Sequence, residues 1–82
     1  MNRFIRVYSN KTDKLISEVD VQSFDLMKFQ NLFGVNDTEN PMFDCFEVTP
    51  EIAGAIEAHL SSKPDWNFSA YSYFLETDAP GT

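Results

Sequence analysis

The sequence predicts an α+β domain with the element order β-β-α-β-α-β, built on a four-stranded, mostly antiparallel sheet with two helices on one face. Two observations favour this class. Apolar and polar residues alternate with a period of two in several segments, and apolar residues recur at helical spacing in two others. The 82 residues are expected to form a single domain, 1–82, because this length is typical of one domain.

The first two strands are predicted as a hairpin. Residues 3–8 (RFIRVY) alternate apolar side chains with arginines, and residues 14–21 (KLISEVDV) alternate again. Between them, residues 9–13 are rich in side chains that bond their own backbone, which is typical of a turn. In the second strand one side carries Leu15, Val19 and Val21, and the other carries Lys14, Glu18 and Asp20.

The first helix is predicted over residues 23–33. Ser23 is a suitable N-cap, and Gly34 is suited to the left-handed position that follows a helix. Residues 35–42 are expected to form an irregular acidic loop. The apolar stripe of this helix consists of Leu26, Phe29, Leu32 and Phe33.

A short strand over residues 43–48 and a second helix are expected next. Thr49 and Pro50 mark the start of the helix, since proline at the first helical position loses no hydrogen bond. The helix is expected to end near residue 60. Its buried stripe is Ile52, Ala55, Ile56 and Leu60.

The last strand is predicted over residues 67–76, with its two faces set by alternation. One face, assigned to the core, carries Phe68, Ala70, Ser72 and Phe74. The other face, assigned to the outside, carries Tyr71, Tyr73 and Leu75.

The formal net charge is −7, and it is unevenly distributed. The chain up to Lys28 has five basic and four acidic residues, whereas the remainder has nine acidic residues and Lys63. This negative charge would repel nucleic acid and anionic membranes and attract a basic protein. Acidic surfaces also keep proteins soluble, so charge alone leaves both interpretations open.

A cytoplasmic location is expected. Cys45 is the single cysteine, so no disulfide can form within the chain, which favours a reducing compartment. No apolar run approaches the roughly 18 residues needed to span a bilayer. No secretory signal pattern is present at the N-terminus.

The residues offer no catalytic constellation, so we expect a protein that is not an enzyme and uses no cofactor. His59 is the only histidine, and its position near a helix end favours a structural role. Cys45 has acidic neighbours, which disfavour a reactive thiolate, and is interpreted as a small buried hydrophobe. Asp37 and Glu39 lack the spacing of a calcium loop, so no metal site is expected.

A binding surface remains as the candidate site. Tyrosine and tryptophan are common in interface hot spots, and carboxylates around such rings suit a basic protein. The alternative is that these rings fill the core, as small domains require. The candidate partner-binding residues are Asp44, Glu47, Asp65, Trp66, Tyr71, Tyr73 and Glu76.

The run from Leu32 onward, LFGV…NPMFDCFEVTPEIAGAIEAHL…YSYFLET, resembles the cloacin and E-type colicin immunity proteins. The similar features are Gly-Val before an acidic loop, the segment 45–48 (CFEV), a short helix and a closing aromatic strand. The chain is also similar to an uncharacterised group of small bacterial proteins with the same hairpin and helix ends. The immunity resemblance implies a four-stranded antiparallel sheet that inhibits a toxin nuclease through acidic and aromatic residues.

The function predicted from these observations is an immunity protein that neutralises a nuclease toxin, expected to be an RNase of a bacteriocin or contact-dependent system. A basic nuclease groove would attract an acidic inhibitor. The alternative is a small acidic interaction or regulatory protein that binds another basic protein. A DNA mimic is less favoured because the carboxylates are clustered rather than regularly spaced.

Overall fold

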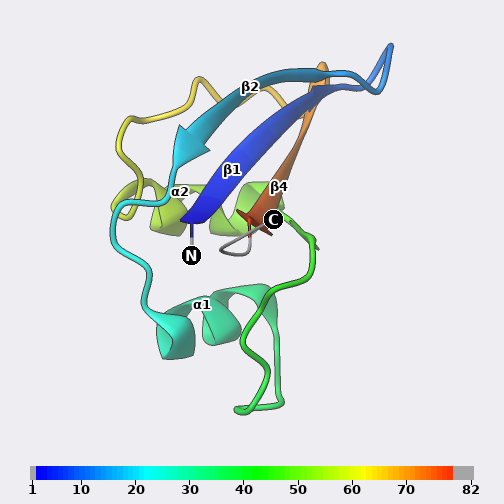
Figure 1. Cartoon of the computed structure of the whole chain (residues 1–82). Coiled ribbons are helices and arrows are strands. Elements are labelled where there is room, and N and C mark those ends of the chain that lie inside the picture. Colours follow the sequence, from blue (N-terminus) through cyan, green and yellow to red (C-terminus); the bar gives the residue numbers. More distant parts are fainter. Residues whose placement is uncertain (1, 79–82) are drawn as a thin grey trace.

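The computed structural model describes residues 2–78 and confirms the α+β class and the predicted element order (Figure 1). All neighbouring strands of its single four-stranded sheet are antiparallel. In chain order the elements are β1 (Asn2–Ser9), β2 (Leu15–Asp20), α1 (Leu26–Phe33), β3 (Phe46–Glu47), α2 (Pro50–Glu57) and β4 (Tyr71–Asp78).

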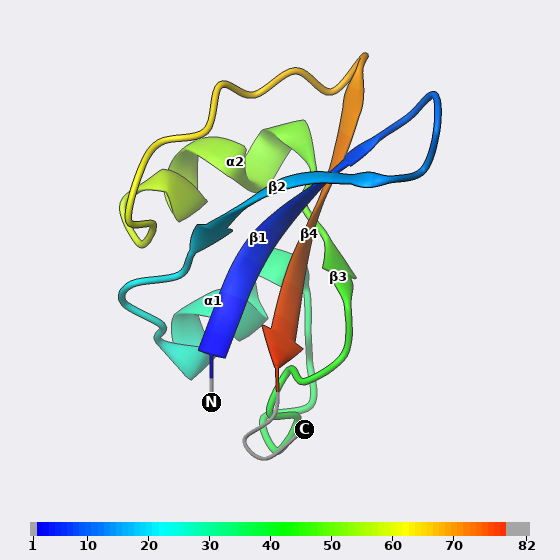
Figure 2. The same ribbon diagram turned by 45° about the horizontal axis from the view of Figure 1, so that its top comes forward.

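The sheet has the strand order β2-β1-β4-β3, so the first and last strands of the chain form its centre. β1 and β4 pair along their full length, from Asn2 opposite Asp78 to Ser9 opposite Tyr71. Both helices lie on the same side of this sheet, as Figures 1 and 2 show. No described helix covers the other side, which we call the open face.

The hydrophobic core lies between the sheet and the two helices. Alternate residues of β1 and β4 point into it, and they meet the apolar sides of α1 and α2 and of the loops between elements. The core residues are Ile5, Val7, Phe29, Met42, Val48, Ala53, Ile56, Leu60, Tyr73 and Leu75.

The predicted hairpin is present and is closed by local hydrogen bonds. The Ser9 hydroxyl accepts from the backbone N–H groups of Lys11 and Thr12, at 3.1 and 3.2 Å. Asp13 adopts a left-handed conformation with φ 61°, which aspartate tolerates better than most residues. A register irregularity between Val7 and Tyr8 lies next to this turn.

The first helix begins later than predicted, because Asp25 rather than Ser23 is its N-cap. The Asp25 carboxylate accepts from the backbone N–H of Lys28. The Ser23 N–H instead donates to the carbonyl of His59, at 3.2 Å, which ties this segment to the end of α2. Gly34 ends the helix in the left-handed conformation, φ 70°, as predicted.

The segment predicted as a strand over 43–48 pairs only at Phe46 and Glu47. Met42 takes a left-handed φ of 57° and is fully buried, so the chain turns into the core there before it reaches the sheet. α2 starts at Pro50, as predicted, and ends at Glu57 rather than near residue 60.

The face assignment of the last strand is wrong. Tyr73 and Leu75 are 2% and 0% exposed and face the helices, whereas Phe74 lies on the open face opposite Arg6. The strand begins at Tyr71, and residues 68–70 form a turn in which the Tyr71 N–H donates to the Asn67 carbonyl. The alternation of side chains between the two faces of the strand therefore begins at Tyr71. The side on which Phe68 lies does not determine the faces of β4, because the turn at residues 68–70 separates Phe68 from the strand.

Candidate protein-binding face

Strand register identifies the side chains of the open face, because residues directly opposite one another in a sheet point to the same side. Arg6 pairs with Glu18 on one neighbour and with Phe74 on the other. Phe74 in turn pairs with Glu47 of β3. The same rule places on this face Phe4, Arg6, Tyr8, Glu18, Asp20, Glu47, Phe74, Glu76 and Asp78.

The open face is strongly acidic. Five of these residues are carboxylates, from β2, β3 and β4, and Arg6 is the one cation among them. The described residues that form this face therefore carry a net negative charge that a cationic surface would complement.

Arg6 holds three of the carboxylates in place. Its Nε donates to Glu18 at 2.8 Å, and its Nη1 donates to Glu76 at 3.2 Å. Nη1 and Nη2 also form a two-point contact with Asp78, at 3.1 and 2.8 Å. The hydrogen bonds that Arg6 donates to Asp78 and Glu18 raise the pKa of Arg6, and the Arg6 guanidinium lowers the pKa of Asp78.

Glu76 is held from its other side by Tyr8 and Cys45. The Tyr8 hydroxyl donates to Oε2 at 2.7 Å, and this bond is the main reason that the pKa of Tyr8 rises to about 12. The Cys45 thiol contacts the same oxygen at 3.7 Å. Cys45 is exposed, so its interpretation as a buried hydrophobe is wrong; partial burial of the sulfur and the charge of Glu76 raise its pKa.

Three rings lie among these charges: Phe4, Tyr8 and Phe74, each half-buried. Tyr8 and Phe74 meet edge to face with centroids 5.8 Å apart, and the guanidinium carbon of Arg6 lies 4.7 Å from the Phe4 ring centroid. Rings held in this way offer contact area that is already ordered before a partner binds.

Sequence reasoning missed these three rings and Arg6 as site residues. The signal that could have found them is the alternation of β1, where the aliphatic Ile5 and Val7 share one side and Phe4, Arg6 and Tyr8 must therefore share the other.

Two of the seven predicted partner-binding residues lie on the open face. Glu47 is exposed opposite Phe74, and Glu76 is half-buried between Arg6 and Tyr8. Asp44 is exposed in the segment just before β3, where no strand register assigns its side chain to a face.

The other four predicted residues lie on the helix side of the sheet or in the segment that leads into β4. Tyr73 is buried, and its hydroxyl accepts from the Asn67 N–H at 2.8 Å. The Trp66 ring packs against Tyr73 with centroids 4.8 Å apart, and its Nε1 donates to Glu57 of α2. Tyr71 is half-buried, and it lines a cavity together with the exposed Asp65.

The predicted site therefore divides between two sides of the sheet. Tyr73 fills the core, which was the alternative that the sequence left open, and Tyr71 and Trp66 pack against that core. The interpretation of Tyr71 and Tyr73 as outward anchors is wrong because it followed from the wrong face assignment of β4, whereas Trp66 lies before that strand and packs against Tyr73.

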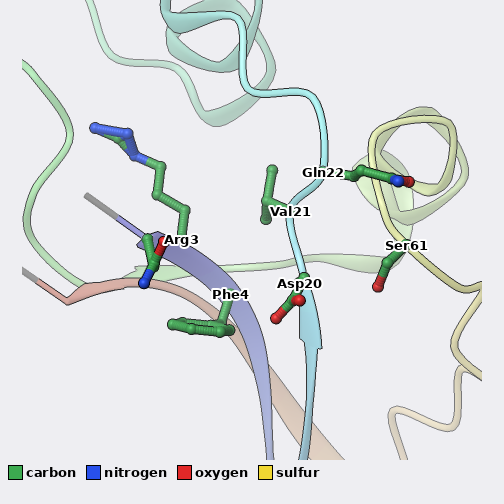
Figure 3. Close-up of a pocket in the computed structure, with 7 residues that line it drawn as sticks. Arg3, Phe4, Asp20, Val21, Gln22 and Ser61 are labelled. Atoms are coloured by element: carbon green, nitrogen blue, oxygen red, sulfur yellow. The ribbon is translucent and has the colours of Figure 1, made fainter.

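A different cavity, of about 350 Å³, lies beside the start of β1 (Figure 3). Arg3 borders it, but its side chain extends away from Asp20 and Ser61. The Arg3 guanidinium lies 3.7 Å from the centroid of the Phe24 ring and donates to the Pro41 carbonyl at 2.8 Å. Burial lowers the pKa of Arg3, and its guanidinium is occupied by the Phe24 ring and the Pro41 carbonyl rather than directed into the cavity.

His59 links α2 to the segment before α1. Its Nδ1 lies 2.8 Å from the Ser23 carbonyl and therefore carries the proton of that hydrogen bond. Within residues 2–78 no group of three or more His, Cys, Asp or Glu side chains is arranged to hold a metal ion. None of the helices in the same range is long and apolar enough to cross a membrane.

Residues 2–76 match a family described as a domain of unknown function, DUF7683. The chain belongs to the DUF7683 family. The match covers nearly all of the chain, from the first strand to Glu76 in β4, and so includes every open-face residue except Asp78. A search of the curated proteins finds no match, and a search of the solved structures finds none either.

Proposed function

We propose that this protein is a binding protein whose open face docks a basic protein, and that the basic protein is a nuclease toxin which it neutralises as an immunity protein. The observation that carries the first step is the acidic, ring-bearing open face, in which Arg6 fixes three carboxylates. The second step rests on the resemblance to immunity proteins and on the chemistry of nucleases.

A nuclease must be basic where it grips the phosphate backbone. An inhibitor with a net charge of −7 is therefore drawn towards it by long-range attraction, and its negative face is repelled from nucleic acid. Once in contact, carboxylates that are already ordered lose little side-chain entropy, and neighbouring rings bury apolar area.

Binding a basic protein of another kind, as a regulatory or interaction protein, uses the same face. The two functions differ in the partner and not in the surface, so the experiment has to identify the partner by its activity.

The experiment is co-expression with the nuclease domain of a toxin encoded directly beside this chain. Cells that also make this protein are expected to grow, while cells with the toxin domain alone die. Glu47→Lys should reduce protection because it places a cation in the docking face, whereas Glu39→Lys, in the exposed loop after α1, makes the same charge change and should leave protection intact.

Death with and without this protein would reject the immunity function. Equal protection by both lysine variants would reject the open face as the docking surface, while leaving the function itself in place.

A further inference from the structure

A third cavity, of about 300 Å³, opens on the open face beside the hairpin turn. Its lining comes from four places in the chain: the end of β1, the turn, the segment before β3, and β4. Tyr8 and Phe74 supply rings, Glu76 and Asp13 supply carboxylates, and Asn10 and Cys45 supply further polar groups. No lysine or arginine lines it.

The size of the cavity limits its occupant. About 300 Å³ is the lower end of the range of small-molecule sites, so one side chain fits better than a cofactor. Two carboxylates and no cation in the lining favour a positively charged side chain.

We propose that this cavity takes an arginine side chain of the basic partner, with its guanidinium between Glu76 and Asp13 and against the rings of Tyr8 and Phe74. This inference rests on the proposed function, because it names the group by which the partner is anchored. Arginine suits the site better than lysine, because its planar guanidinium stacks on rings and donates to carboxylates in a fork.

Glu76 can accept one more donor. Its Oε2 takes the Tyr8 hydroxyl and the Cys45 thiol, and its Oε1 takes Arg6. A carboxylate has about four acceptor positions, so one remains on Oε1 for a single N–H, and the two-point contact of the guanidinium falls to Asp13. Asp13 is exposed in the turn, and none of its described hydrogen bonds uses the carboxylate.

The open face already binds one guanidinium in the proposed manner. Arg6 lies 4.7 Å from the Phe4 ring centroid and forks onto the Asp78 carboxylate. The cavity offers the same combination of a ring and a carboxylate. It lies on the side of Glu76 that faces away from Arg6, and no lysine or arginine lines it.

The test is an NMR titration of the isotope-labelled protein with acetyl-arginine methylamide, compared with acetyl-lysine methylamide in which the side-chain amine is free. Saturable shifts are expected at the backbone amides of Tyr8, Asn10 and Ser72, with weaker binding of the lysine compound. Asp13→Asn and Phe74→Leu should each weaken arginine binding by about two- to fivefold, as the loss of one partly exposed charge or ring contact predicts.

Asp13→Asn is the sharper variant, because asparagine accepts the left-handed φ of 61° and the backbone is not strained. Glu39→Gln removes one carboxylate away from the open face and should leave arginine binding unchanged. Equal affinity for the arginine and lysine compounds would overturn the inference. So would an affinity for the arginine compound that is unchanged in both Asp13→Asn and Phe74→Leu.

The outcomes separate this inference from the proposed function. If the cavity binds arginine but the protein gives no protection against a nuclease toxin, the arginine site stands and the proposed partner is rejected. If the protein protects but binds no arginine, the proposed partner stands and the arginine site is rejected.

Discussion

Arg6 is the residue that organises the open face. Its side chain is 18% exposed and contacts Glu18, Glu76 and Asp78, whose mutual repulsion it offsets. Without it, three carboxylates, of which Glu76 is half-buried, would lie close together with no described cation between them. Arg6 therefore both stabilises the sheet and sets the positions of the charges that a partner meets.

Replacing Arg6 with methionine should lower the free energy of unfolding at pH 7 by about 1–3 kcal/mol, because charge-assisted hydrogen bonds are lost and their acceptors remain. Lys28→Met, at an exposed position of α1, is the control for loss of one positive charge. Urea unfolding of the three proteins measures the difference.

The pH dependence of that loss follows from Asp78, whose pKa is lowered in the folded state from its ordinary 3.8. A group with a lowered pKa stabilises the fold above its ordinary pKa and loses that contribution as the pH falls through the folded value. The difference between wild type and Arg6→Met should therefore shrink below about pH 4. A difference that stays constant down to pH 2 would contradict the ion-pair explanation.

Tyr8 should titrate with a pKa of about 12, above its ordinary 10.0, because its hydroxyl donates to Glu76. A raised pKa means that the bond stabilises the fold below pH 10 and that this contribution is lost as the pH rises through about 12. The difference in tyrosinate absorbance between wild type and Tyr8→Phe measures it. A difference that titrates at the ordinary value would show that the hydrogen bond is absent in solution.

Among the elements, those fixed by local pattern were predicted best. The hairpin, the end of α1 at Gly34 and the start of α2 at Pro50 each depend on a few neighbouring residues, and all three are present. The start of α1 differs from the prediction because a distant partner decides it: the Ser23 N–H donates to the carbonyl of His59.

The faces of β4 could not be predicted from its own sequence. Both sides of that strand carry rings, so hydrophobicity does not distinguish the core from the open face. The choice is made by the turn at residues 68–70 and by pairing with β1, which is distant in sequence. The candidate residues were chosen with these faces in mind, so the structure places Glu47 and Glu76 on the open face and the predicted rings elsewhere.

Two glycines should respond in opposite directions to alanine. Gly34 has φ 70°, and a Cβ there would meet no atom within 4 Å, so Gly34→Ala adds only backbone strain and should destabilise by about 1–2 kcal/mol. Gly54 lies within α2 with equally open surroundings, so Gly54→Ala should stabilise by about 0.5–1 kcal/mol. Thermal unfolding tests both. Destabilisation by Gly54→Ala would mean that α2 is not a regular helix there.

In the whole molecule, the hydrophobic core and the charged surface lie on opposite sides of the sheet. The helix side holds the core and encloses Tyr73, and Trp66 packs against it, while the open face carries five carboxylates, Arg6 and three half-buried rings. Because the charges lie on the side that no described helix covers, a partner can approach them without unfolding any element.

Affinity for the purified nuclease domain, measured for wild type, Glu47→Lys and Glu39→Lys, is the decisive comparison. Both variants change the net charge equally, and only Glu47 lies on the open face. Docking on that face predicts that Glu47→Lys weakens binding at least about tenfold, through repulsion at close range, while Glu39→Lys changes it less than about twofold. Equal loss in the two variants would show that only the overall charge matters and would contradict a docking site on the open face.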